Sequence, residues 1–265
     1  MSRLFNRETI FQLENLEIKM PGLIIEFSIK FNTEDEGNVG EITFYNLADK
    51  TLNQLEKDKE FKLISGYKEH KGVILPGIIK KTKTQWDEVD KVTTLLVGDN
   101  TDKWLTTTIN KTWKAGKTAK DIAPQIIKKT GLDIGEININ KNVTYSKGKT
   151  FSTTCKKALK EIAKDTETKL HSSRGKVYLR PKDISNNKAI LLNSNTGLIS
   201  SPEKIDDSED GKKYSVQSFL NYKIQSDSLV KIESKTITGN YRVVEGEHSS
   251  SEGSHVTKME VKALE

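Results

Sequence analysis

The sequence predicts a mostly β protein (β+α) with two small β-barrel-type domains and an intervening small α+β domain. Segments in which apolar residues alternate with polar ones dominate both ends of the chain, as in half-buried strands. Between them the apolar spacing changes to three and four, which is typical of helices. Only 34% of the 265 residues are hydrophobic, which favours small modules over one large core. We expect domains at residues 1–112, 113–181 and 182–265.

The first domain is predicted from consecutive strands that each have one apolar face. Residues 25–31 alternate most regularly, and the loop 32–38 is expected to join them to a strand at 41–45 as an antiparallel hairpin. Sequential hairpins of this kind must close or be covered, so we expect a barrel or a curled sheet. The other elements expected here are a strand at 16–20, a short helix carrying Leu52 and Leu55, a strand at 61–67, and strands within 80–96 that turn at 87–90.

The middle domain is predicted from two apolar stripes at helical spacing. The first covers 118–130, with Gly131 as its stop and with Pro124 expected to kink or delay the helix. The second begins at Phe151 and continues to Ala163. Alternation at 136–140 and 176–180 adds two strands, so this part of the chain is expected to be a small α+β module.

The last domain is predicted to be β-rich again, after a polar linker at 185–188. An acidic turn at 206–211 leads into a strand that begins at Tyr214, and a hairpin over 230–244 is expected to turn at 238–240. The sequence ends at Glu265 directly after its last predicted strand, so no appended enzymatic domain is expected.

Charge and cysteine content restrict the functional classes. Lysine and arginine exceed aspartate and glutamate by 43 to 37, and the lysine pairs are spread along the chain, so a solvated surface is favoured over a specific nucleic-acid site. One cysteine excludes an internal disulfide, and Cys155 lies on an apolar stripe, which predicts a core thiol. The N-terminus lacks the apolar segment of a signal peptide, and no run is long enough to span a membrane, so we expect assembly in the bacterial cytoplasm without membrane insertion.

Apparent catalytic motifs fail on inspection. The Gly116 and Gly148 Lys-Thr sequences lack the earlier glycine of a phosphate-binding loop, since Lys111 and Val143 stand there. The four histidines are too far apart in sequence for a local metal motif. We therefore expect no enzyme activity, no catalytic residue, no cofactor and no metal.

Each of the three segments carries short sequence motifs. The first segment has a strand ending in Asn46-Leu47, then Ser65-Gly66-Tyr67, then Gly77-Ile78. The middle segment has Gly-x-Thr-x-x-Asp-Ile, Tyr-x-x-Gly-Lys and Ala-Leu-x-x-Ile-Ala sequences at 116–122, 145–149 and 158–163. The last has Leu-Asn-x-x-Ile at 220–224, a strand at 229–234 and Gly-x-Tyr-x-Val ending in His248. In this order the motifs resemble those of baseplate hub proteins of contractile phage tails, the late control protein D type, except that Tyr222 replaces the family's usual proline and no tryptophan follows Gly253.

The resemblance implies a homotrimeric ring in the baseplate of a phage virion or of a tailocin, a contractile injection system without DNA. Its partners would be the tail tube protein, the central spike protein, other baseplate components and, as a further candidate, the tape measure protein. Two alternatives from other classes stay open, a tail-tip peptidoglycan hydrolase and a basic channel protein that contacts nucleic acid. The residues do not distinguish a phage from a tailocin.

The strands expected nearest the ring and its lumen are 23–31, 41–47 and 229–244. The candidate residues on them are Ile25, Phe27, Ile29, Ile42, Phe44, Val230, Ile232, Tyr241 and Val243. His248 is expected to fix the end of its strand by polar contacts and not to act in catalysis.

Overall fold

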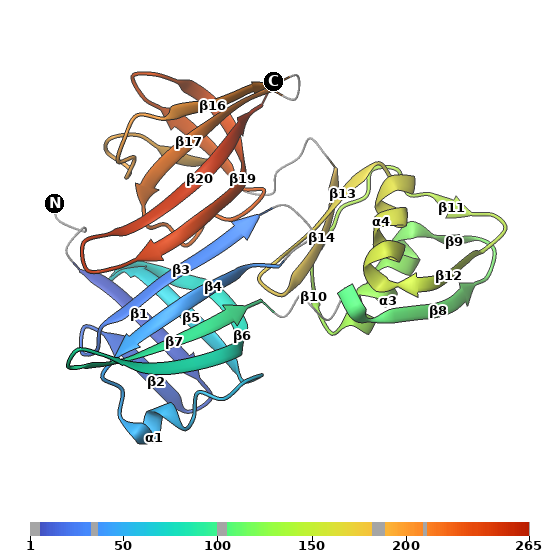
Figure 1. The fold of residues 1–265 in the computed structure, drawn as a ribbon. Coiled ribbons are helices and arrows are strands. Elements are labelled where there is room, and N and C mark those ends of the chain that lie inside the picture. The colour runs from blue at the N-terminus through green and yellow to red at the C-terminus, as the bar shows by residue number, and fades with distance from the viewer. Residues whose placement is uncertain (1–5, 33–36, 100–104, 182–188, 209–210, 265) are drawn as a thin grey trace. The chain divides into compact units, whose positions relative to one another are not determined.

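The computed structural model describes residues 6–32, 37–99, 105–181, 189–208 and 211–264 (Figure 1). The chain forms two compact units. The β unit comprises residues 1–33, 38–98 and 185–265, and the α+β unit comprises residues 34–37 and 99–184. Strands far outnumber helices in the chain, so the predicted mostly β fold is confirmed.

The β unit consists of an N-terminal half and a C-terminal half. The elements of the N-terminal half are β1 (Arg7–Leu13), β2 (Leu16–Met20), β3 (Ile25–Asn32), β4 (Val39–Tyr45), α1 (Asp49–Leu52), β5 (Glu60–Tyr67), β6 (His70–Asp87) and β7 (Asp90–Gly98). Those of the C-terminal half are β15 (Ile190–Leu192), β16 (Glu203–Ser208), β17 (Gly211–Phe219), β18 (Leu229–Glu233), β19 (Thr238–Ser250) and β20 (His255–Ala263).

One 13-stranded sheet runs through both halves. Its main path is β16-β17-β20-β19-β3-β4-β7-β6-β5-β1-β2, and β18 and β15 branch from β19. The antiparallel pairing of β3 with β19 joins the two halves. Among the described strands no pairing connects β16 to β2, so the path stays open, and closed barrels are not found in the hydrogen-bonding pattern.

Each half of the sheet has its own hydrophobic core. The core of the N-terminal half is centred on Phe11, Phe44 and Leu63, and that of the C-terminal half on Val230, Val243 and Val261. Two buried core residues cross between the halves. Phe31, at the end of β3, packs into the C-terminal core, whereas Leu220, which follows β17, packs into the N-terminal core. These exchanged side chains tie the two halves together.

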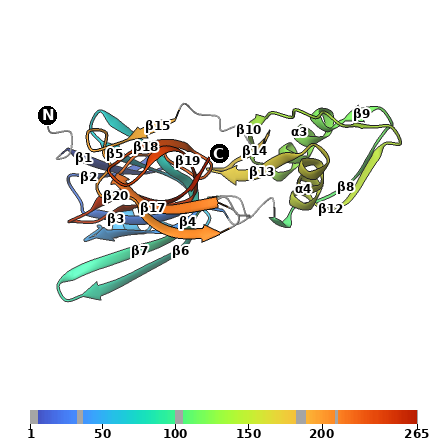
Figure 2. The same cartoon turned by 90° about the horizontal axis from the view of Figure 1, so that it is seen from above.

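Strands β6 and β7 form a long hairpin. Its turn lies between Asp87 and Asp90, as predicted. Figure 2 shows the paired ends of these strands extending beyond the neighbouring strands of the unit. At the tip, Trp86 is 71% exposed and Val89 is 83% exposed. Large apolar side chains exposed together are typical of contact surfaces.

Several predicted strands of the β unit are confirmed, and two details are wrong. The hairpin of residues 25–31 with 41–45 is present as β3 and β4. Residues 1–20 contain a hairpin of two strands, β1 and β2, instead of one strand. The C-terminal hairpin of β18 and β19 turns at 234–237 and not at 238–240, because the Ser234 hydroxyl accepts hydrogen bonds from the backbone of that turn.

The α+β unit has a core of its own between two helices and three small sheets. The bounds of its elements are β8 (Thr108–Trp113), β9 (Lys117–Thr118), α3 (Ala119–Thr130), β10 (Asp133–Ile137), β11 (Thr144–Tyr145), β12 (Lys149–Thr154), α4 (Cys155–Asp165), β13 (Thr168–Ser173) and β14 (Lys176–Pro181). β8 pairs with β12 and so lies in this unit, although the sequence analysis places residues up to 112 in the first domain.

Polar caps determine where the two helices begin. Thr118 and Asp121 form a reciprocal capping box at the start of α3, and Gly131, with a φ of 77°, ends that helix as predicted. Pro124 lies inside α3 and does not delay its start. Thr154 caps α4, so Phe151 lies in β12 and not on the predicted helical stripe.

Candidate functional site: the strands that join the two halves

The candidate site is the part of the sheet where β3, β19 and β20 lie side by side. Residues 27–32 of β3 pair with residues 245–250 of β19, although more than 200 residues separate them in sequence. β19 continues the sheet to β20 on its other side. The structure therefore brings all three expected ring segments, 23–31, 41–47 and 229–244, into one sheet within a single chain.

The nine candidate residues of the ring strands are all buried. Five contribute to the N-terminal core and four to the C-terminal core. Their side chains stabilise the fold and are not available to a lumen or a neighbouring subunit. The assignment of their strands to the ring stays a prediction, and the accessible side chains of these strands are those that alternate with the nine.

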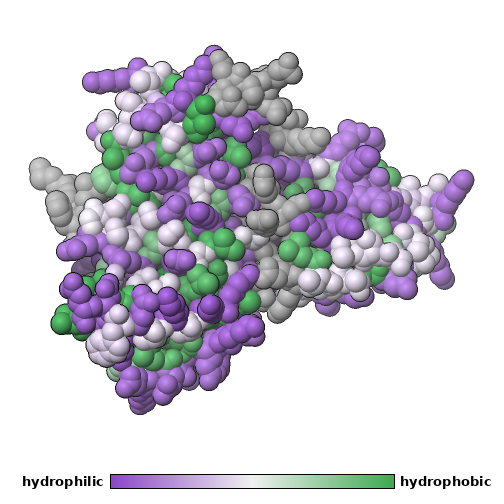
Figure 3. All heavy atoms as spheres, in the orientation of Figure 1, coloured by the Kyte–Doolittle hydropathy of each residue, from purple (hydrophilic) through white to green (hydrophobic). Residues whose placement is uncertain are grey.

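The accessible face of the junction is polar and hydrogen bonded. Tyr45 donates to the Glu26 carboxylate at 3.0 Å, and Ser28 donates to Glu247 at 2.9 Å. Burial, together with the Glu26 hydrogen bond, raises the pKa of the Tyr45 hydroxyl. The face seen in Figure 3 is largely hydrophilic, with smaller hydrophobic areas between.

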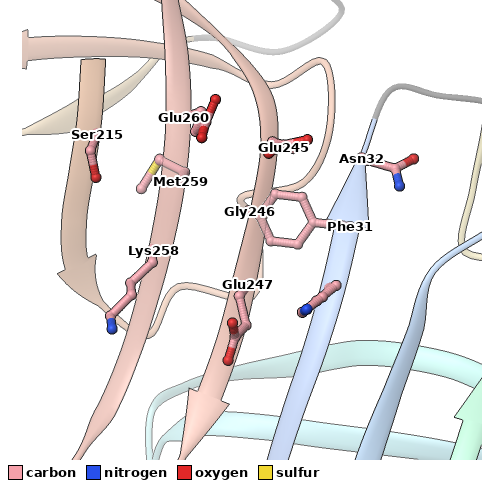
Figure 4. Close-up of a pocket in the computed structure, with 10 residues that line it drawn as sticks. Phe31, Asn32, Ser215, Glu245, Gly246, Glu247, Lys258, Met259 and Glu260 are labelled. Carbon is pink, nitrogen blue, oxygen red and sulfur yellow. The ribbon is translucent and has the colours of Figure 1, made fainter. Parts of the chain in front are cut away.

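A groove of about 330 Å³ lies on this face across β3, β19, β20 and β17. Phe31, Gly246 and Met259 form part of its lining, and the two larger side chains are buried. Gly246 is needed there, because a Cβ atom would lie 2.4 Å from the Lys258 carbonyl oxygen and 2.6 Å from the Phe31 ring. The groove is thus lined partly by apolar atoms, and charged side chains also line it (Figure 4).

The glutamates that line the groove have different neighbours on the adjacent strands. Glu247 lies opposite cationic residues, whereas Glu245 and Glu260 lie opposite each other. Glu247 lies in register between Lys30 and Lys258, so each of its neighbours is cationic. Glu245 and Glu260 lie directly opposite each other, and the residues flanking this pair are Asn32 and Ser215. Like charges directly opposite on neighbouring strands destabilise a sheet. We call Glu245 and Glu260 the carboxylate pair.

His248 lies on β19, one of the strands that form the groove, and its side chain is buried. Its Nδ1 lies 2.9 Å from the Thr257 hydroxyl and its Nε2 lies 2.9 Å from the Ile224 carbonyl oxygen. Its ring also lies 4.8 Å from that of Phe31. These contacts tie β19 to β20 and to the loop before β18, and they favour the structural role expected for this residue.

His255 was not predicted as a site residue, and it joins the two halves. Its Nδ1 lies 2.9 Å from the Ser250 hydroxyl, and its Nε2 lies 3.3 Å from the Gly66 carbonyl oxygen of β5. Burial, together with the positive charge of Arg7, lowers its pKa to about 4. No sequence signal marks this contact between the halves, because Gly66 lies in a distant strand.

Comparison by sequence and by structure gives different results. No protein-family model matches the chain, and no curated protein matches it. Solved structures do match: the tail protein from Neisseria meningitidis has a TM-score of 0.71 at 10% identity, with 97% of each chain covered. The 43 kDa tail protein of prophage MuSo2 from Shewanella oneidensis has a TM-score of 0.66 at 10% identity, with 97% of this chain and 98% of that one covered.

A third structure belongs to a secretion system. The E. coli c3393 protein is a component of the type VI secretion system and is described as structurally similar to the T4 bacteriophage tail proteins gp27 and gp5. It has a TM-score of 0.61 at 8% identity and covers 96% of this chain and 77% of that one. The chain shares its fold with these proteins.

Cys155 and groups of metal-ligating residues are the other candidates for a functional site. Cys155 is fully buried, and burial raises the pKa of its thiol. Within the described ranges no group of three or more His, Cys, Asp or Glu residues could hold a metal ion.

No helix in the described part of the chain is both long and apolar enough to cross a membrane.

Proposed function

We propose that this protein is a structural baseplate hub of a contractile tail or tailocin, and that it forms a homotrimeric ring between the tail tube and the central spike. The observation that carries the proposal is the fold shared with the Neisseria and Shewanella tail proteins over 97% of this chain. The motif resemblance to the late control protein D type adds to it, since it arises from sequence and not from structure.

The two halves of the β unit suit a ring of this kind. Each half has its own core, so one chain offers two β surfaces, and three chains would offer six. A contact between the N-terminal half of one subunit and the C-terminal half of the next is heterologous and can close into a ring. We propose that the predicted domains at residues 1–112, 113–181 and 182–265 correspond to a ring domain, an insert and a second ring domain, with β8 added to the insert because it pairs with β12.

The first test is the mass of the protein in solution. Light scattering should give about three times the 29.9 kDa chain mass, and electron microscopy of the protein with its tail partners should place it in the baseplate. A monomer at all concentrations, absent from assembled particles, contradicts the proposal.

Cysteine cross-linking tests which unit builds the ring. Because β3 and β19 already pair within one chain, the probes belong on other strands, such as exposed Glu41 of β4 and Lys231 of β18. Cysteines at these positions on different subunits should give covalent oligomers in assembled particles. If only residues of the α+β unit cross-link between subunits, the ring is built differently.

We propose that the exposed tip of the β6–β7 hairpin contacts a neighbouring component of the particle. Trp86→Ser should leave folding unchanged, because this side chain is 71% exposed, and should reduce incorporation into particles. A matched exposed control is Lys62→Ser. Equal incorporation of both variants contradicts this contact.

We also propose that the protein has no enzymatic role. Incubation with purified peptidoglycan should release no soluble fragments. Turnover that disappears on a single Asp or Glu substitution would establish the hydrolase alternative instead.

A further inference from the structure

The α+β unit carries a large excess of positive charge. Residues 105–181 contain 17 Lys and Arg against 6 Asp and Glu, a net charge of +11. The whole chain has 43 and 37 of these residues, so the remaining residues have 26 and 31, a net charge of −5. The two parts of the chain are therefore oppositely charged, which the overall value of +6 conceals.

Helix α4 carries three exposed lysines on one face. Lys157, Lys160 and Lys164 are exposed and lie on the face opposite its buried residues, and we call these three residues the lysine row. Lysines at spacings of three and four residues repel each other. Lys157 also lies in the first turn, where the helix dipole disfavours a cation, and that turn contains no acidic residue.

The acidic residues of α4 are occupied on another side of the helix. The Lys149 ammonium of β12 lies 2.6 Å from the Glu161 carboxylate and 3.2 Å from that of Asp165. Asp165 also accepts a hydrogen bond from Tyr145. Helix α3 differs, because Asp121 stands in its first turn and Lys128 and Lys129 in its last turn, where each charge complements the dipole. The last-turn lysines of α3 are thus explained by helix stability, as is Lys164 in the last turn of α4, whereas Lys157 in the first turn of α4 is not.

We propose that the lysine row of one copy of this chain binds the carboxylate pair in the groove of a second copy. The two features have opposite charge, and in each of them like charges lie close together. Neighbouring lysines of the row are about 4.5 Å and about 6 Å apart along the helix axis, and residues directly opposite in an antiparallel sheet are about 5 Å apart. Two lysines can therefore meet both carboxylates at once.

Glu245 and Glu260 line the groove, whereas the side chains of Phe31 and Met259 are buried in the C-terminal core (Figure 4). The groove therefore offers a lysine its two carboxylates and no accessible apolar side chain from these two residues. The contact joins two different surfaces, so it builds a chain or a ring of subunits. This inference does not depend on the proposed hub function.

Charge exchange tests the contact. We would measure self-association by sedimentation at low salt for the wild type, for Lys157→Glu with Lys164→Glu, and for Glu245→Lys with Glu260→Lys. Each double variant should associate at least about tenfold more weakly, because like charges then face each other. Mixing the two variants should restore association between them, which a contact within one chain cannot do. High salt should weaken the wild-type contact.

The controls separate charge from folding and from other ligands. Lys57→Glu with Lys62→Glu makes the same charge change on exposed residues of the β unit and should leave association unchanged. If a charge-reversed variant misfolds, Lys157→Gln with Lys164→Gln replaces it. The proposal is wrong if the lysine variants associate like the wild type, or if mixing the lysine and glutamate variants does not restore association. It is also wrong if the lysine variants lose the binding of a DNA duplex but keep self-association.

Discussion

Gly72 of β6 lies directly under the ring of Tyr222, which comes from the loop between β17 and β18. A Cβ atom on Gly72 would be 2.3 Å from two carbon atoms of that ring. Tyr222 also packs against the core of the N-terminal half. Tyr222 is therefore a contact between the two halves of the β unit.

Gly72→Ala should destabilise the protein by about 1–3 kcal/mol, because the ring must move out of a packed position. In a Tyr222→Ala background the same change should cost about 0.5 kcal/mol or less. Denaturant unfolding of the four variants measures this coupling. Gly253→Ala is the control, since nothing lies within 4 Å of its added carbon. Equal costs of Gly72→Ala in both backgrounds would show that the ring is elsewhere.

His255 should make the stability of the β unit depend on pH. Its pKa is about 4 in the folded protein against 6.5 as the ordinary value, chiefly because of burial. The unfolded chain takes up the proton first, so this contribution is complete above about pH 6.5 and is lost as the pH falls toward 4, by roughly 3 kcal/mol.

Denaturant unfolding at pH 7 and pH 5 checks this effect against a variant. His255→Gln should lose less stability than the wild type between these two values. His70→Gln changes an exposed histidine and should follow the wild type. Parallel pH curves for wild type and His255→Gln would mean that the imidazole is not buried as described.

The sequence indicates the burial of individual residues better than their partners. Ile42 and Cys155 are buried as their patterns predict. The contact of His255 with Gly66 depends on a strand 189 residues away, and no local pattern encodes it. The same holds for the carboxylate pair, which becomes visible only when the register of β19 with β20 is known.

At the scale of elements, α4 separates residues that stabilise the fold from residues that do not. Leu159 is fully buried, so Leu159→Ala should cost about 2–5 kcal/mol. Lys157→Ala should leave stability unchanged or raise it by about 0.5 kcal/mol, because it removes a cation from the first turn. Thermal unfolding compares the two variants. Similar losses for both would mean that α4 is oriented differently.

Strands were predicted where alternation involves large apolar residues, as in β3. β8 and β12 were not predicted, because only Ile109 and Trp113 of β8 and Phe151 of β12 are buried, and the rest of these strands is Thr, Lys, Ser and Asn. Phe151 also lies at helical spacing from Cys155 and Ala158, so the sequence pattern includes it in the predicted helix although it belongs to β12. The end of a helix depends on its cap, and Thr154 is a weak signal in a run of three Ser and Thr residues.

At the scale of the whole molecule, the β unit is assembled from two separated parts of the chain. Replacing residues 99–184 by a flexible linker of about 15 residues should leave a β unit that unfolds cooperatively, because its two cores contain no residue of the removed part. Circular dichroism and a thermal scan measure this.

A chain that stops at residue 184 is the comparison. It keeps β3 but loses β19, so the edge of β3 and the side chain of Phe31 become exposed, and we expect aggregation. If this chain is as soluble and cooperative as the linked one, the two halves are independent and the sheet is not continuous.

The pairing of β3 with β19 also affects how the protein is made. The ribosome releases β3 early, but its partner strand β19 follows more than 200 residues later. The edge of β3 therefore stays unpaired during most of translation. Loop closure over such a distance is slow compared with the formation of the local hairpins. During this interval nascent chains on one messenger could pair with one another through β3, which makes synthesis rate and chaperone supply the conditions that decide yield.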